Sequence, residues 1–271
     1  MHYRHAYHAG NFADVWKHCV LHATLTAMNR KARPWSYVDT HAGAGRYALN
    51  SAAADSTGEW RDGIGRLRAA ADRAPEAVRA FLQVVDAAGD GCYPGSPWLA
   101  MQMARPDDQL LLVESQAPIA DALADCCGAR ATVQRRDGYR ADALLPPRHA
   151  RGLVLVDPPF ERPDEFRAVA DLLGRCADRY RHAVHMLWYA RKNAVEADRM
   201  LRRVARAFDR PLWHAMVDHG AAGAGRMHAC GVALVNPPYG LDTQLAEPLA
   251  WMAGILARDP RATHRLEWME P

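Results

Sequence analysis

Seven short apolar runs alternate with helical patterns along most of the chain, and this alternation constrains the fold more than any other feature. The runs cover residues 35–40, 109–114, 131–135, 152–157, 183–189, 212–218 and 231–236. Helical periodicity separates most of them, at residues 12–29, 117–127, 165–180 and 194–208. Strands that alternate with helices form βαβ units, so the sequence predicts an α/β fold with a doubly wound, mostly parallel sheet.

The last two runs differ from the others because no helix separates them. A glycine-rich segment that includes residues 220–225 joins them instead. Such a short link predicts a hairpin, so the seventh strand should run antiparallel to the sixth. Parallel strands that end in such a hairpin are typical of the class I S-adenosylmethionine-dependent methyltransferase fold. We therefore expect a Rossmann-like seven-stranded sheet whose last strand is antiparallel.

One segment does not fit the alternation of strands and helices. Residues 48–108 are rich in alanine and arginine and lie between the first two predicted strands. We interpret them as an inserted, mostly helical subdomain, which leaves residues 1–47 and 109–271 as the methyltransferase domain. The arginines of this segment predict either contacts with a nucleic-acid backbone or a solvated helical face.

The composition sets limits on class and location. The chain has 271 residues, of which 49% are hydrophobic and 24% charged, as is ordinary for a soluble globular enzyme. Because no apolar run is long enough to span a membrane and the first residues lack a signal-peptide core, we expect a cytoplasmic protein without membrane contacts. Six cysteines show no zinc spacing, and His2, His5 and His8 have no further ligands arranged around them, so no metal is expected.

A glycine loop and three acidic positions predict a cofactor site. Small residues around Gly43, directly after the first strand, let the backbone turn sharply and approach a ligand. Glu114 ends the second strand, where a carboxylate can accept both hydroxyls of a ribose, and Asp137-Gly138 follows the third strand, where it can meet an adenine amine. Each residue alone is an ordinary turn former or helix cap. Together they lie in the crevice where open α/β sheets bind ligands.

The tetrapeptide Asp157-Pro158-Pro159-Phe160 follows the apolar run 152–156 and carries the most specific chemistry. The exocyclic amine of a base can donate hydrogens to the Asp157 carboxylate and the Pro158 carbonyl while the ring stacks on the Phe160 side chain. This arrangement holds a weak nitrogen nucleophile towards an electrophile. A strand closed by a proline turn with an aromatic plug is the alternative interpretation.

A second match, Asn236-Pro237-Pro238-Tyr239, is equally good as a motif. The predicted topology distinguishes the two sequences. Asp157 ends a parallel strand next to the first strand, whereas Asn236 ends the antiparallel strand and should lie at the opposite edge. We therefore expect Asn236 to be structural.

Taken together, these residues resemble the RlmJ family, bacterial 23S ribosomal RNA adenine-N6 methyltransferases that use S-adenosylmethionine. The resemblance covers essentially the whole chain and is most specific at residues 3–18, 39–47, 93–97 and 157–160. It implies Asp157 as the catalytic acceptor and Tyr3 as a residue on the substrate side. It also implies cofactor contacts at His18, His41, Ser96, Glu114, Asp137 and Gly138.

The resemblance also implies the partner, 23S ribosomal RNA, and we expect the protein to be a monomer. Lys17 lies on the same predicted helix as His18 and is expected on the RNA side, with a solvent-facing position as the alternative. Two other functions stay open at this point. Asp-Pro-Pro-Phe also occurs in DNA adenine-N6 methyltransferases, and a non-catalytic RNA-binding protein could keep the same fold.

Overall fold

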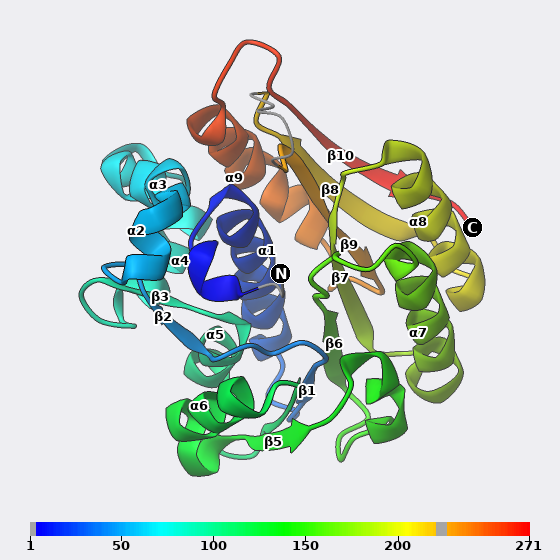
Figure 1. Ribbon diagram of the computed structural model, residues 1–271. Coiled ribbons are helices and arrows are strands. Elements are labelled where there is room, and N and C mark those ends of the chain that lie inside the picture. Colours follow the sequence, from blue (N-terminus) through cyan, green and yellow to red (C-terminus); the bar gives the residue numbers. More distant parts are fainter. Residues whose placement is uncertain (1–3, 221–226) are drawn as a thin grey trace.

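The computed structural model describes residues 4–220 and 227–271. A single large sheet divides the molecule, with helices on both sides (Figure 1). Its eight strands lie in the order β10-β8-β9-β7-β6-β1-β4-β5. The strands are β1 (Ser36–Asp39), β4 (Gln109–Glu114), β5 (Thr132–Arg135), β6 (Gly152–Val156), β7 (Val184–Ala190), β8 (Leu212–Asp218), β9 (Ala229–Val235) and β10 (Thr263–Met269).

The pairing of the strands confirms the predicted fold. β1 lies in the centre, parallel to β4 and β6, and the parallel arrangement continues to β5 on one side and β7 on the other. β9 is antiparallel to both β7 and β8, between which it lies. The β8–β9 connection therefore reverses the chain as predicted, although residues 221–226 of the glycine-rich link lie outside the described residues.

An eighth strand, β10, was not predicted. It pairs antiparallel to β8 along its whole length, from Thr263 opposite Asp218 to Met269 opposite Leu212. Its residues are exposed or half-buried, and it lies at the edge of the sheet. The strand escaped prediction because an edge strand with charged and polar residues has no apolar run to identify it.

Helices cover both faces of the sheet (Figure 1). The helices α1 (Phe12–Asn29), α5 (Ser96–Met103), α6 (Ala117–Cys127) and α9 (Leu241–Leu256) pack on one face, and α7 (Glu165–Tyr180) and α8 (Ala194–Phe208) pack on the other. α1 spans the residues that its periodicity predicts. Its first turn is fixed by Asn11, whose side chain accepts hydrogen bonds from the backbone N–H groups of Ala13 and Asp14.

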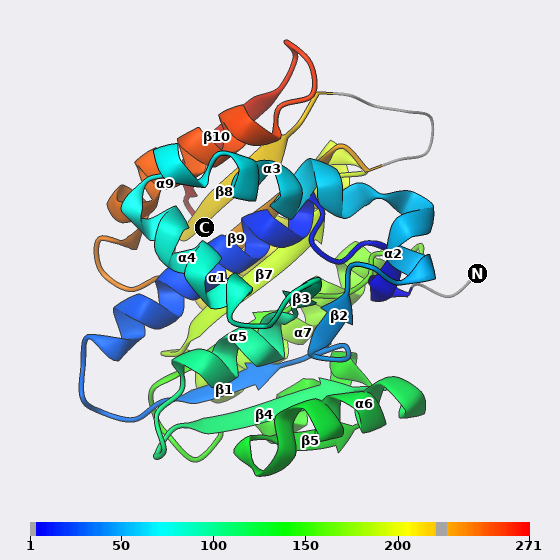
Figure 2. The ribbon, with the colours of Figure 1, turned by 90° about the vertical axis from the view of Figure 1, so that its left-hand side faces the viewer.

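Residues 48–108 lie beside α1 (Figure 2) and are largely helical. They form α2 (Ala52–Thr57), the π-helical turn η2 (Arg61–Gly65), α3 (Arg66–Ala69), the 3-10 turn η3 (Ala71–Arg73), α4 (Glu76–Asp86) and α5, and β3 (Cys92–Pro94) pairs with β2 (Arg46–Ala48). Short 3-10 turns elsewhere are η1 (His5–Tyr7), η4 (Gly128–Arg130) and η5 (Gly138–Leu144). Apolar side chains such as Ile64, Leu67 and Phe81 join the core around α1. The segment therefore shares a core with the sheet, and its role as an inserted subdomain stays a prediction.

No helix in the described part of the chain is long and apolar enough to cross a membrane.

Candidate active site

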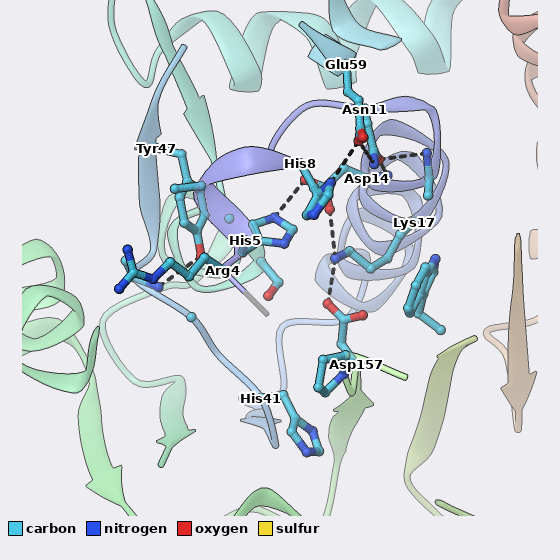
Figure 3. Close-up of a pocket in the computed structure, with 18 of the residues that line it drawn as sticks. Arg4, His5, His8, Asn11, Asp14, Lys17, His41, Tyr47, Glu59 and Asp157 are labelled. Atoms are coloured by element: carbon cyan, nitrogen blue, oxygen red, sulfur yellow. Dashed lines mark hydrogen bonds and ion pairs between the residues drawn. The ribbon is translucent and has the colours of Figure 1, made fainter. Parts of the chain in front are cut away.

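A pocket of about 1010 Å³ opens at the carboxyl ends of β1, β4 and β6, beside the first turns of α1 (Figure 3). A cavity of this size is large enough for a nucleotide-like cofactor together with part of a second ligand. Eight of the predicted site residues line it: Lys17, His18, His41, Gly43, Ser96, Glu114, Asp157 and Pro158. The topology thus brings together residues that are up to 141 positions apart along the chain (17 to 158).

The remaining predicted site residues are placed differently. Asp137 is exposed, and its side chain accepts a hydrogen bond from the backbone N–H of Tyr139. Gly138 is buried against the end of β1, where a Cβ atom would lie 2.1 Å from the Thr40 carbonyl oxygen. Neither residue lines the pocket, nor does Phe160. Tyr3 lies outside the described residues.

The loop after β1 approaches Glu114 closely. The Gly43 N–H donates to the Glu114 carboxylate at 3.1 Å, and the Gln116 N–H donates to the other carboxylate oxygen at 2.8 Å. Gly43 and Gly45 have φ angles of +65° and +79°, which glycine adopts without steric cost. This geometry leaves a tight turn and a fixed carboxylate facing the pocket.

Two histidines present buried nitrogen atoms without protein partners. His18 binds the Tyr93 hydroxyl through Nδ1 at 2.9 Å, and His41 binds the Thr40 hydroxyl through Nδ1 at 2.7 Å. The Nε2 atoms of both rings are buried and have no hydrogen-bond partner among the described residues. Burial lowers the pKa of His41 to about 4 and that of His18 well below its usual value, so both rings are neutral. Buried unpaired nitrogens of this kind are suited to a polar ligand.

The Asp157 carboxylate is held by a buried lysine (Figure 3). Lys17 Nζ lies 2.5 Å from Asp157 Oδ2 and 3.0 Å from Asp14 Oδ1, and the Lys17 side chain is only 5% exposed. Burial alone would lower the pKa of this ammonium, but the two carboxylates outweigh it and raise the pKa above its usual value. The prediction that Lys17 contacts RNA does not fit this geometry, because its ammonium is enclosed between two carboxylates.

Sequence reasoning missed Asp14. Its second carboxylate oxygen accepts hydrogen bonds from His5 Nε2 at 2.8 Å and from the Gly10 N–H at 3.0 Å. Burial alone would raise the pKa of Asp14, but the contacts with the His5 ring and the Lys17 ammonium outweigh it and hold the pKa well below its usual value. An acid in the first turn of a helix is ordinary, so nothing marked Asp14 as special. Its three-residue spacing from Lys17, which puts both on one helix face, was the available signal.

The Ser96 hydroxyl lines the pocket but donates to Asp39, at 2.7 Å. Asp39 ends β1 and also accepts hydrogen bonds from the Tyr37 hydroxyl at 2.8 Å and the His41 N–H at 3.2 Å. Burial raises the pKa of the Asp39 carboxyl to about 6. Ser96 and Asp39 therefore tie α5 to the loop that follows β1.

The Phe160 ring belongs to the core on the far side of the motif. Only 6% exposed, it packs against Phe166 and Trp188 with ring centroids 5.1 and 5.8 Å away. Phe160 has a φ of +52°, and its carbonyl accepts a hydrogen bond from Lys192 Nζ at 2.9 Å. Trp188 and Lys192 line the pocket and were not predicted. The plug that the alternative interpretation expected is thus present, while Asp157 and Pro158 face the pocket.

Asn236 lies at the opposite edge of the sheet, as the topology predicts. Its side-chain amide donates to the carbonyls of Arg181 and Ala183, both at 2.8 Å, and its oxygen accepts from Arg210 at 2.9 Å. These contacts join the end of β9 to the segments before β7 and β8.

Among the described residues, no group of three or more His, Cys, Asp or Glu side chains is arranged to hold a metal ion.

Comparisons with known proteins extend over the whole chain. The family described as "Ribosomal RNA large subunit methyltransferase D, RlmJ" matches residues 32–270. The chain is 34% identical to the Ribosomal RNA large subunit methyltransferase J of Escherichia coli and 32% identical to that of Haemophilus influenzae, with 99% of both chains covered in each case. Among solved structures, the protein LPL1258 of Legionella pneumophila superposes with a TM-score of 0.88 at 25% identity, covering 96% of this chain and 98% of that chain.

Proposed function

The chain belongs to the RlmJ family of ribosomal RNA large subunit methyltransferases, and from this membership we propose its reaction. We propose that it transfers a methyl group from S-adenosylmethionine to the N6 amine of an adenine in 23S ribosomal RNA. One observation carries the proposal: the carboxylate of Asp157, directly before Pro158, lines the same pocket as the glycine loop and Glu114.

The residues around the glycine loop fit S-adenosylmethionine. Glu114 offers a fixed carboxylate for ribose hydroxyls, and the backbone at Gly43 allows close approach. The unpaired Nε2 atoms of His18 and His41 are suited to the polar groups of the cofactor. When bound, the cofactor supplies an electrophilic methyl group on a sulfonium. We propose that Ser96 contributes to the site indirectly, by holding the end of β1 and the loop that follows it. Asp137 and Gly138 are proposed to form the end of the site that receives the adenine.

The Asp157 carboxylate is proposed to accept a hydrogen bond from the N6 amine, with the Pro158 carbonyl as the second acceptor. Because the nitrogen lone pair is delocalised into the ring, positioning must supply most of the rate, and well-oriented reactions gain roughly 7–11 kcal/mol in this way. As positive charge develops on N6, Asp157 or water takes its proton.

Two aromatic side chains are proposed to hold the base. Tyr3 is expected on one of its faces. Stacking on Phe160 requires that its ring leave the contacts with Phe166 and Trp188. The flanking backbone is already in an unusual conformation, with a φ of +52° at Phe160. The indole of Trp188, which lines the pocket, is the alternative to Phe160 as a surface on which the base can stack.

Basic side chains around the pocket favour a polyanionic substrate. Arg4, Arg46 and Lys192 line it and are exposed. Such side chains contact phosphates of RNA and DNA equally well, so the choice of RNA rests on the family. We infer that these residues, and not Lys17, contact the backbone of the substrate.

The test is methyl transfer from tritium-labelled S-adenosylmethionine to protein-free 23S RNA, with duplex and single-stranded DNA as competitors and nucleoside analysis of the product. Label in N6-methyladenosine from RNA alone supports the proposal. Label in DNA supports a DNA adenine-N6 methyltransferase. Cofactor binding without label in either polymer refutes the proposed transfer to nucleic acid, and RNA binding without cofactor binding supports a non-catalytic RNA-binding protein.

A further inference from the structure

Asp14, Lys17 and Asp157 form one buried cluster of charges at the pocket (Figure 3). The side chains of Asp14 and Lys17 are 4% and 5% exposed, and that of Asp157 is 13% exposed. Lys17 lies between the two carboxylates, and burial weakens the screening of both contacts by solvent.

Asp14 also fixes the position of the lysine ammonium. An ammonium has three N–H donors, and two of those of Lys17 have carboxylate acceptors, on Asp14 and Asp157. Two carboxylates restrain the position of Lys17 Nζ more than one would. The direction of the hydrogen bond from Nζ to Asp157 Oδ2 is therefore fixed. No described residue donates a hydrogen bond to Asp157 Oδ1, which leaves that oxygen to an incoming amine.

A third property of Asp14 connects the cluster to the chain that precedes α1. Its Oδ2 atom accepts from His5 and from the Gly10 backbone, so the same carboxylate that holds Lys17 also holds the N-terminal segment over the pocket. The Asp14 side chain thereby positions both Lys17 and the segment before α1 at the pocket.

We propose that Asp14 is a positioning residue for methyl transfer, which acts through Lys17 to orient Asp157. The inference rests on the proposed function and deepens it, because it names a further residue on which the rate depends. Positive charge develops on N6 during transfer, and a carboxylate of Asp157 that is already held in place stabilises that state without reorganisation. Replacing Asp14 by a neutral side chain weakens one of the two anchors of Lys17 and so loosens Asp157.

The first experiment compares single-turnover methylation of 23S RNA by the wild type and Asp14→Asn. We expect the rate to fall at least about tenfold, while the dissociation constant of S-adenosylmethionine stays within about threefold. Asp108→Asn is the matched control, because Asp108 is a buried acid, paired with Arg105, on the segment before β4 at the other end of the sheet. It should lower the melting temperature but leave the rate within about twofold. A loss of less than tenfold in Asp14→Asn would overturn the role of Asp14.

A double-mutant cycle separates positioning through Lys17 from a merely structural role. In a Lys17→Met background, Asp14→Asn should reduce the residual rate by less than about threefold, because its effect passes through the lysine. A larger further loss in that background overturns the proposal. If Asp14→Asn alone does not fold, the double variant still decides, since it removes both charges together and leaves no buried lysine without its partner. An active wild type with an equally active Asp14→Asn refutes only this inference, whereas a wild type that forms no N6-methyladenosine refutes the proposed function.

Discussion

Lys17 is the contact that joins α1 to the carboxyl end of β6. It is one of three lysines in the chain, with Lys31 and Lys192, among 34 basic residues. The sequence predicted the helix on which Lys17 lies but left open whether Lys17 faces the pocket or solvent, and nothing in the sequence indicated the partner 140 residues away. A lysine at a helix start is usually solvated, and only the folded sheet brings Asp157 to its ammonium. The residue types of this site were therefore predictable, and their pairing was not.

The buried Asp39 carboxyl makes the stability of the protein depend on pH. Its folded pKa of about 6 lies above the ordinary 3.8, so burial of its ionised form costs stability. This cost is absent below about pH 4, develops as the pH rises, and is complete above about pH 6. Raising the pKa from 3.8 to about 6 corresponds to a loss of about 3 kcal/mol in the free energy of unfolding. The free energy of unfolding of Asp39→Asn should therefore rise relative to the wild type by about 3 kcal/mol between pH 4 and pH 7.

Urea unfolding of both proteins across this pH range measures the difference. Parallel curves for wild type and variant would show that Asp39 is not the source of the pH dependence.

At the scale of elements, α1 and β10 show what a sequence pattern can and cannot predict. The bounds of α1 were predicted from its helical periodicity, and the structure adds the cap that the Asn11 side chain supplies. β10 was missed because an edge strand buries little and lacks a continuous apolar run. For Phe160 the motif was recognised but the burial of the ring was not predicted. That burial depends on Phe166 and Trp188, which come from other elements.

Gly138, at the start of η5, packs directly against the residues that follow β1. A Cβ atom at Gly138 would lie 2.1 Å from the Thr40 carbonyl oxygen and 2.6 Å from His41 Nε2. Gly138→Ala must therefore push the β5–η5 connection away from the β1 loop. We expect a loss of roughly 2–4 kcal/mol in stability and at least about a tenfold weaker affinity for S-adenosylmethionine.

Gly174→Ala in α7 is the matched control, because a Cβ atom there would meet nothing within 4 Å. It should raise stability by about 0.5–1 kcal/mol and leave cofactor affinity unchanged. Thermal melts and calorimetric titration with S-adenosylmethionine measure both quantities. Equal cofactor affinity in the two variants would contradict the proposed part of Gly138 in the cofactor site.

At the scale of the whole molecule, strand direction assigns different places to two similar motifs. Asp157 follows a parallel strand and lines the pocket, whereas Asn236 follows the antiparallel β9 and lies at the other edge. As motifs the two are equivalent, and the strand directions, which were inferred from the sequence, separate them. The inferred hairpin was therefore the step on which the assignment of the site depended.

Asn236→Ala tests this separation. The variant loses two hydrogen bonds to the carbonyls of Arg181 and Ala183 and keeps a φ of +54°, which alanine adopts at a cost. We expect a loss of roughly 2–4 kcal/mol in stability, with turnover within about twofold of the wild type at a temperature where both are folded. A selective loss of turnover in a stable variant would contradict a purely structural role.

Asp157 is proposed to position the amine that receives the methyl group, and replacing Asp157 gives the sharpest test of this role. Single-turnover methyl transfer to 23S RNA is measured for the wild type and Asp157→Ala, with the affinity of each for S-adenosylmethionine determined by calorimetry. We expect transfer to fall by at least about a thousandfold while cofactor affinity stays within a few fold. Near wild-type transfer by Asp157→Ala would contradict this role.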